Sequence, residues 1–295
     1  MKRYIIIFVL IFLFIGCEKY IDMEIPDRGR KLVMNCLYSD TGNVIVNISL
    51  SKFILDNAPF SAISGAHVYL YENGFIVDTL TEINSGRYCS NGFVPSMNAT
   101  HKIEAFYGSY SVTAQSFIPK PAEFALEDTT LIQSEFNEAL RLRIRINDSA
   151  NESNYYLIGF ETKNLYYEED HFNPALYFDT EEPYIEAFHN EYGIFSDNLF
   201  NGQNQLLSFD LDLYHFVEDS TTVYIKLFSI SRDMYMYLLT LTAQQQSMES
   251  FFAEPVMVYN NIENGFGIFA GYTFRTDSVI IPKLTDSWDY EKGRN

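Results

Sequence analysis

Apolar and polar residues alternate along much of this chain, as they do in β-strands. The segments 44–50 (VIVNISL), 140–147 (LRLRIRIN) and 205–213 (QLLSFDLDL) show this period of two clearly. Successive side chains of a strand point to opposite faces of a sheet, so the alternation predicts strands with one buried face. Further strand-forming runs occupy 31–37, 86–88, 101–106, 110–117, 124–131, 155–162 and 222–229. The chain is therefore predicted to be mainly β.

The strongest local signal is a hairpin. Two β-prone runs within 66–80 (AHVYLYENGFIVDTL) flank Asn73-Gly74. Both central residues of a type I′ turn need positive φ, which Asn and Gly tolerate best. A second turn is predicted at Gly108-Ser109, between the runs 101–106 and 110–117.

One segment has helical spacing. Met234, Leu238 and Leu241 recur at intervals of three to four residues. Ser231 before them is a suitable N-cap, and Asp233 places an acid in the first turn. These features predict a helix over 232–252, after which strand patterns return at 256–260, 267–274 and 278–281.

The strands divide into two predicted domains. Short strands separated by turns over 31–120 are typical of an immunoglobulin-like β-sandwich. The boundary is predicted at Ile118-Pro-Lys-Pro121, because proline cannot donate to the ladder of a central strand. Residues 121–295 are predicted to form a second antiparallel β-domain that carries the helix.

The first residues have the layout of a secretory signal. Lys2 and Arg3 precede an apolar run that is shorter than the roughly 20 residues of a membrane-spanning helix. Gly16 and Cys17 then form the end of a lipobox, although Phe14 stands where Leu is usual. Residues 1–16 are thus predicted to be a signal peptide, and 17–30 a tether whose Cys17 is acylated, with palmitate among its chains. The alternative is an uncleaved signal anchor with a chance Cys.

Charge narrows the range of partners. The chain of 295 residues has 39 Asp and Glu against 20 Lys and Arg, a formal net charge of −19. Nucleic-acid binding needs a basic surface, so we do not expect this acidic chain to bind nucleic acid. The same charge argues against direct adhesion of the protein surface to anionic lipid.

Two cysteines remain in the exported part. Cys36 and Cys89 lie in a chain predicted to leave the cytoplasm, where disulfides persist. They either form a disulfide or remain two free thiols, since sequence does not fix their distance.

No catalytic motif stands out. Ser49-Leu-Ser-Lys52 has the spacing of acyl-serine enzymes, but it ends a strand where that chemistry needs a helix start. None of the five histidines forms a close pair with another. The chain is predicted not to be an enzyme and to need no cofactor or metal. A hydrolase with a site assembled from distant residues is the alternative.

A long irregular stretch, 164–202, is the predicted ligand or partner surface. It combines acidic and aromatic residues, which supply charge selection and contact area. The candidate residues are Glu168, Glu169, Asp170, His171, Tyr177, Tyr184 and Tyr192. A solvated acidic loop without a ligand is the alternative for this stretch.

Arg141, Arg143 and Arg145 form a basic row on one face of the strand 140–147. Pairing with acids on a neighbouring strand is the expected role of such a row. Contact with an anion or a partner is the alternative.

The segment 252–272 (FAEPVMVYNNIENGFGIFAGY) is distinctive and is called the signature segment below. With Cys17–Asp22, Lys31–Asn35 and Val68–Gly74, it resembles a family of Bacteroidota lipoproteins described only as domain of unknown function 4249. Within it, Asn264-Gly265 predicts a turn, and Gly267 and Gly271 predict bulges or close backbone approach. A turn that feeds a core strand is the expected role, and a ligand-touching loop the alternative.

The resemblance implies a location and a partner. Such proteins lie at the outer membrane, held by their lipid on its periplasmic or its surface-exposed side, and are encoded beside TonB-dependent receptors. We therefore expect a lipid-anchored accessory that captures ligand for such a receptor or covers its barrel. The alternative is a structural or assembly factor of the cell envelope without a small ligand.

Overall fold

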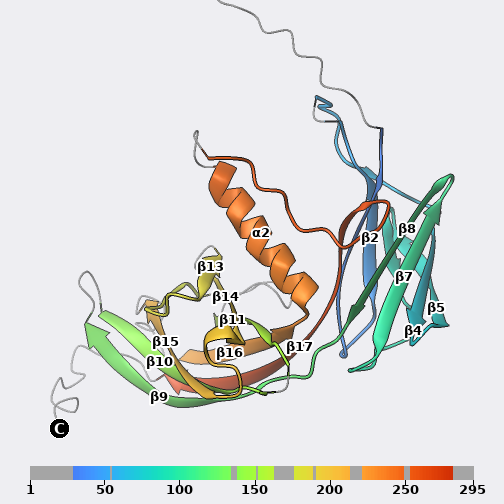
Figure 1. Cartoon of the computed structure of the whole chain (residues 1–295). Coiled ribbons are helices and arrows are strands. Elements are labelled where there is room, and N and C mark those ends of the chain that lie inside the picture. The colour runs from blue at the N-terminus through green and yellow to red at the C-terminus, as the bar shows by residue number, and fades with distance from the viewer. Residues whose placement is uncertain are drawn as a thin grey trace, which may run out of the picture.

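The computed structural model describes residues 29–53, 55–133, 138–150, 152–162, 176–188, 191–212, 221–248 and 253–281. Its strands form two sheets, of 13 and four strands. Figure 1 shows two lobes, with the N-terminal strands on the right and the later strands with helix α2 on the left. The mainly β prediction is confirmed.

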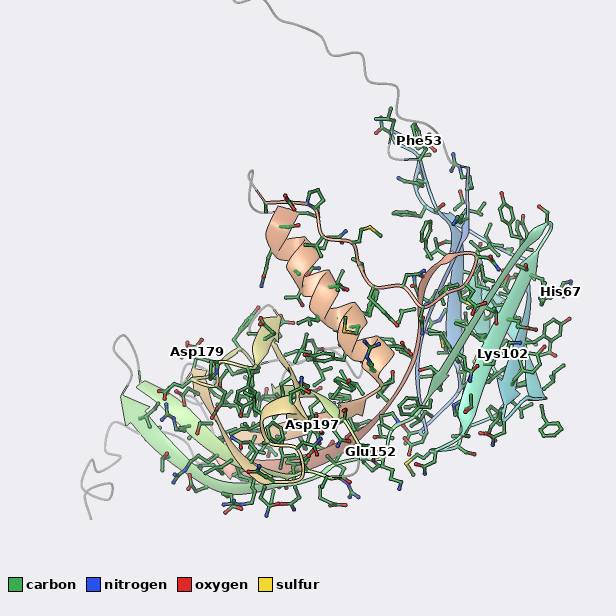
Figure 2. The ribbon with its side chains drawn as sticks, in the orientation of Figure 1. Phe53, His67, Lys102, Glu152, Asp179 and Asp197 are labelled. Carbon is green, nitrogen blue, oxygen red and sulfur yellow. The ribbon has the colours of Figure 1, made fainter. Side chains whose placement is uncertain are left out.

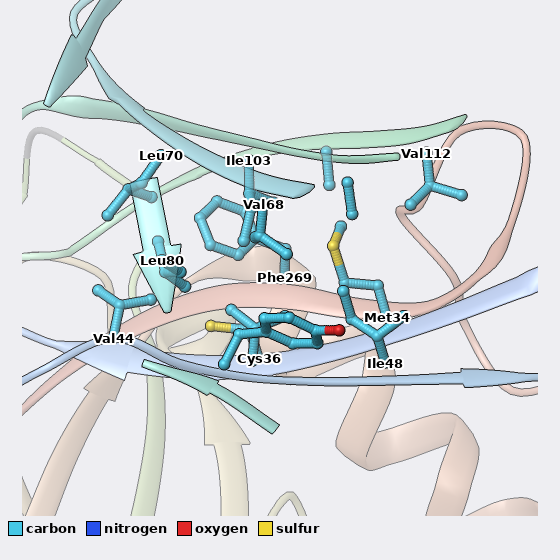
Figure 3. Close-up of a cluster of buried hydrophobic side chains, with 14 of the residues drawn as sticks. Met34, Cys36, Val44, Ile48, Val68, Leu70, Leu80, Ile103, Val112 and Phe269 are labelled. Carbon is cyan, nitrogen blue, oxygen red and sulfur yellow. The ribbon is translucent and has the colours of Figure 1, made fainter. Parts of the chain in front are cut away.

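The first lobe is a β-sandwich. Strands β1, β2 and β6 face β4, β7 and β8, and the long strand β5 pairs with both β4 and β6. The core between the layers contains Met34, Ile48, Val68 and Ile103 (Figure 3). The strands of this lobe are β1 (Leu32–Ser39), β2 (Ile45–Leu50), β3 (Ser61–Ala62), β4 (His67–Glu72), β5 (Phe75–Asn84), β6 (Arg87–Cys89), β7 (Thr100–Tyr107) and β8 (Tyr110–Phe117).

Both predicted turns of this lobe are present. Asn73 and Gly74 join β4 to β5 with φ of 51° and 86°, as a type I′ turn requires. Gly108, with φ of 56°, begins the connection of β7 to β8.

The second lobe has three layers. A four-stranded sheet, in the order β12-β15-β10-β9, packs on β11 and β16, and α2 covers the opposite side of those strands. Strand β11 is consequently buried on both faces. The elements are β9 (Glu123–Gln133), β10 (Glu138–Asn147), β11 (Tyr155–Thr162), β12 (Phe178–Asp179), β13 (Glu186–Phe188), β14 (Tyr192–Ser196), η1 (Asp197–Leu199), β15 (Asn204–Asp212), β16 (Thr221–Ile230), α2 (Arg232–Met248) and β17 (Phe266–Ile281).

One strand joins the two lobes. Strand β17 is 16 residues long. Its first half runs parallel to β1, and its second half runs antiparallel to β16 (Figure 1). The sequence predicted two separate strands here. The predicted boundary at 118–121 does fall between β8 and β9, yet Ile262 and Phe269 belong to the core of the first lobe.

The prediction of a strand at 256–260 is wrong. These residues form no strand, because the backbone of Tyr259 bonds to the helix instead of to a sheet. Its N–H donates to Thr240 Oγ1 at 2.8 Å. The segment therefore runs along α2 before it enters the turn at Asn264.

Helix α2 begins as predicted. Ser231 Oγ accepts the N–H of Met234 at 3.4 Å, and Met234 lies in the core between α2 and the sheet. The predicted end at 252 lies outside the described residues, which reach Met248 in this helix. Among the described residues, no helix has the length and apolar composition needed to cross a membrane.

Cys36 and Cys89 are both free thiols, so the disulfide alternative is wrong. Strand β2 lies between β1 and β6, which places the two cysteines two strand spacings, about 9–10 Å, apart. A disulfide requires Cα atoms within about 7 Å. Moreover, Cys36 is buried in the core whereas Cys89 follows the buried Tyr88 and points to the other face.

Candidate functional site

The structure does not gather the predicted surface tyrosines into one site. Tyr177 is 55% exposed, whereas Tyr192 is 8% exposed and packs in the core beside α2. Tyr184 is half-buried, and its hydroxyl accepts a hydrogen bond from Gln205 Nε2 at 3.1 Å. Burial and the nearby charge of Glu182 raise the pKa of Tyr184 to about 12. The remaining candidates, Glu168, Glu169, Asp170 and His171, lie outside the described residues.

The stretch 164–202 is also less irregular than predicted. It contains β12, β13 and β14, and β14 pairs with β11 inside the large sheet. Tyr192 begins β14, which explains why its ring is buried. This strand could not be recognised in the sequence, because apolar Ile194 and Phe195 are adjacent and do not alternate with polar residues.

The arginine row is an ion-pair ladder. Arg141 makes two hydrogen bonds of 2.7 Å to Asp210, which lies directly opposite it on β15. Arg143 pairs with Asp128 of β9, and Arg145 Nε donates to Glu127 Oε1 at 2.6 Å. Because each guanidinium already has a carboxylate partner, this row confirms the expected cross-strand pairing and offers no vacant anion site.

The candidate serine–lysine pair is likewise explained by structure. Ser49 lies within β2, and Lys52 Nζ donates to the carbonyl oxygen of Ala58 at 2.5 Å. In the described ranges, no group of three or more His, Cys, Asp or Glu residues is arranged to hold a metal ion.

The structure does build an aromatic surface, on the outer side of the sheet β5-β4-β7-β8. We call it the aromatic face, formed by Tyr69, Tyr71, Ile76, Lys102, Glu104 and Phe106. The alternating neighbours Val68, Leu70, Ile103 and Ala105 fill the core, so these side chains point outward. Figure 2 shows His67, of the same outer row, on the side of the sheet away from β1 and β2.

Cross-strand register brings these residues into contact. Tyr71 lies opposite Lys102 and Tyr69 opposite Glu104. The rings of Tyr69 and Phe106 are 6.1 Å apart and edge-on. Lys102 Nζ lies 5.2 Å from the centre of the Tyr71 ring, a cation–π contact.

The charges of the aromatic face neutralise one another. Lys102 Nζ lies 2.7 Å from Glu104 Oε1, and the Tyr71 hydroxyl donates to Glu104 Oε2 at 2.6 Å. The hydrogen bond from Lys102 lowers the pKa of Glu104, and the hydrogen bond to Glu104 raises the pKa of Tyr71. This surface can therefore bury its rings against a partner without leaving an unpaired charge.

Sequence reasoning missed the aromatic face because three strands contribute to it. The alternating Tyr69 and Tyr71 within the predicted hairpin were a usable signal. Their partners Lys102, Glu104 and Phe106 lie more than thirty positions further on, and the register of β4 with β7 brings them together.

A second polar cluster is buried at the junction of the lobes. The His101 ring is fully buried, stands edge-on to Tyr38 at 5.3 Å, and has Nε2 3.1 Å from Glu72 Oε1. Ser116 lies opposite His101 and donates a long hydrogen bond, 3.5 Å, to Asp233 at the start of α2. His101 and Ser116 are buried and Asp233 is partly buried, so the cluster has the structural role of joining β8 to the helix.

The signature segment also has a structural role. The Asn261 side chain exchanges two hydrogen bonds with the backbone of Phe269, at 2.8 and 2.9 Å, as a neighbouring strand would. A Cβ at Gly267 would lie 2.1 Å from the Met34 carbonyl oxygen, and one at Gly271 would lie 2.4 Å from that of Phe117. Both glycines thus allow the close backbone approach predicted for them.

Comparisons with known proteins complete the description. No curated protein matches this sequence. Among solved structures, a "putative carbohydrate binding protein" from Bacteroides uniformis is 11% identical over 85% of this chain and 98% of that chain, with a TM-score of 0.19. A biofilm-associated protein BSP domain is 8% identical over 88% of this chain and 61% of that chain, with a TM-score of 0.22. Such low scores carry no argument about function.

The sequence itself gives the assignment. Residues 18–278 match the family described as domain of unknown function (DUF4249), which covers both lobes and the signature segment. The chain therefore belongs to the DUF4249 family.

Proposed function

We propose that this protein is a non-enzymatic, lipid-anchored accessory of an outer-membrane TonB-dependent receptor. In this proposal the protein captures ligand for the receptor or covers its barrel. The observation that supports it is the aromatic face, a partly exposed group of rings on a chain whose sequence shows no catalytic motif.

The composition of the aromatic face favours a protein partner. Tyr and Phe are enriched at protein interfaces, because each ring buries a large area at a small entropic cost. Lys102 and Glu104 already satisfy each other, so desolvating them leaves no isolated charge. Tyr69, Tyr71 and Phe106 would be the centre of the contact, and His67 and Thr79 part of its rim.

A pull-down from native outer membranes in mild detergent tests this function. We expect a TonB-dependent receptor to co-isolate with the tagged protein in near-stoichiometric amount. The double variant Tyr69→Ser, Phe106→Ser should lower recovery of the receptor several-fold. Tyr177→Ser removes an exposed ring from the second lobe and serves as the matched control.

Two results would contradict the proposal. Recovery of the protein without a receptor would contradict its role as a receptor accessory. Recovery of assembly machinery would favour the structural alternative. Equal recovery of the receptor with both variants would retain the partner but exclude the aromatic face as its binding surface.

A further inference from the structure

One end of the first lobe, where the described chain begins, differs from the rest of the surface. Leu32 of β1 pairs with Leu50 of β2, Leu50 pairs with Ser61 of β3, and Val33 pairs with Phe266 of β17. These contacts place the segments 29–33, 50–61 (apart from position 54, which lies outside the described residues) and 263–267 together. We call this the tether end, and Figure 2 shows Phe53 there, far from Glu152 and Asp197 of the second lobe.

The chain that arrives from the predicted lipidation site is fixed at the tether end. Lys31 N–H donates to Ser51 Oγ, and Ser51 N–H donates to the Lys31 carbonyl oxygen, both at 2.9 Å. The Arg30 guanidinium forms an ion pair with Asp56. The twelve Cα–Cα steps from Cys17 to Gly29 can span at most about 40 Å, so an acylated Cys17 keeps this end near the bilayer.

Large apolar side chains are exposed at the tether end. Phe60 is 71% exposed, Leu55 is 65% exposed and Phe266 is 46% exposed. They lie on or beside the loop 51–60, whose sequence SKFILDNAPF is mostly apolar. Loops normally carry polar residues, so these side chains indicate contact with an apolar partner.

Cations accompany these apolar side chains. Lys52 Nζ lies 4.7 Å from the centre of the Phe60 ring, and Lys31 Nζ lies 5.1 Å from that of Phe266. With Arg30, the three segments hold three cations against two acids, Asp56 and Glu263, in a chain where acids outnumber cations 39 to 20. The tether end thus carries a slight excess of cations, whereas the chain as a whole carries a large excess of acids.

We propose that the tether end lies directly on the lipid bilayer. Phe60 and Leu55 would enter the interface between headgroups and acyl chains, while Lys31 and Lys52 extend toward lipid phosphates. The acidic charge of the whole chain opposes adhesion elsewhere, so contact is confined to this end. The sheets of the second lobe, which the chain enters from the other end of β8 and β17, then lie away from the membrane (Figure 1).

This inference rests on the lipid-anchor part of the proposed function and not on its receptor part. It can therefore be tested with the mature acylated protein in vesicles that contain no receptor. Trp288→Phe removes the single tryptophan, and Phe60→Trp then places a reporter at the tether end. Phe75→Trp is the matched control, because Phe75 is similarly exposed at the opposite end of the sandwich.

The readout is tryptophan quenching in phosphatidylcholine and phosphatidylglycerol vesicles with brominated acyl chains. We expect Trp at position 60 to be quenched several-fold more than Trp at position 75 and to emit at shorter wavelength. Leu55→Trp provides a second reporter should Phe60→Trp fail to fold, as judged by circular dichroism. Omission of phosphatidylglycerol should weaken quenching at position 60 if the lysines contact anionic headgroups.

The outcomes separate the two proposals. If mass spectrometry finds the Cys17 peptide without acyl chains, the lipid anchor and this orientation are both overturned. Acylated protein with equal quenching at positions 60 and 75 would overturn bilayer contact and leave the receptor proposal intact. In that case the tether end would be free for a protein partner.

Discussion

At the scale of single residues, burial decides which side chains are open to a ligand and which have a structural role. His101 illustrates this, because its ring is fully buried and Nδ1 has no hydrogen-bond partner among the described residues. Glu72 from β4, Tyr38 from β1 and Ser116 from β8 face it. Burial lowers the pKa of His101 from its ordinary value of 6.5, and the bond to Glu72 only partly opposes this.

This shift predicts a pH dependence of stability. A histidine whose pKa is lower in the folded state binds protons more readily when unfolded. The free energy of unfolding should therefore fall as the pH drops below about 6.5. His101→Phe should flatten this slope in urea unfolding series, and His67→Phe, on the exposed outer row, should retain it. Identical slopes for the wild type and His101→Phe would contradict the prediction.

At the scale of elements, β17 explains the signature segment. The strand must lie beside β1 in its first half and beside β16 in its second. Gly267 allows the first contact, because its φ is +120° and its Cα faces the Met34 carbonyl oxygen. The glycines and asparagines of the segment are thus needed to close the sandwich.

Gly267→Ala should destabilise the protein strongly. The added methyl group would meet the Met34 carbonyl oxygen at 2.1 Å, so β17 would have to move from β1. We expect a loss of about 2–4 kcal/mol in the free energy of unfolding, measured in guanidinium. Gly42→Ala is the matched control, since Gly42 has a φ of +130° with no atom within 4 Å of the added carbon. Similar losses for both variants would show that φ strain, and not the contact, accounts for the cost.

At the scale of the whole molecule, the two lobes share a strand. The first lobe buries Ile262 and Phe269, and the Phe269 ring stacks on Tyr38 at 4.5 Å. Strand β1 would be an open edge without β17, because its other neighbour is β2. The sandwich is therefore complete only when the C-terminal part of the chain has returned to it.

A fragment of residues 29–122 should consequently fail to fold alone. It lacks β17 and the core residues Ile262 and Phe269, so we expect no cooperative thermal transition by circular dichroism. Fusion of residues 260–272 to its C-terminus through a flexible linker should restore a transition. Cooperative melting of the unfused fragment would contradict the dependence on β17.

Much of this architecture could be predicted from local patterns. The alternation in 140–147 gave β10 correctly, because its period of two already separates a buried from an exposed face. Asn73-Gly74 and Ser231 gave the hairpin and the helix start, because turn and cap geometry depend on adjacent residues. By contrast, β14 was missed because burial on both sides removes the alternation.

The candidate site was the less predictable part. Tyr184 and Tyr192 were placed on one surface by composition, yet pairing of β14 with β11 buries one of them. The contact between Tyr71 and Lys102 was not predicted, because it depends on the register of β4 with β7. Aromatic content indicates that rings are available for binding, but burial decides which of them are exposed.

The sequence by itself determined most of the strands, the turns of the hairpins, the helix start and the family of this chain, because these depend on short-range periodicity and local backbone preference. Only the tertiary structure decided that β17 completes the first lobe, that Cys36 and Cys89 are held apart, and that Tyr69, Tyr71 and Phe106 share a face. Each of these results depends on which strands become neighbours and in which register. Pairing between distant segments is set by the burial of the whole core, which no local stretch of sequence specifies.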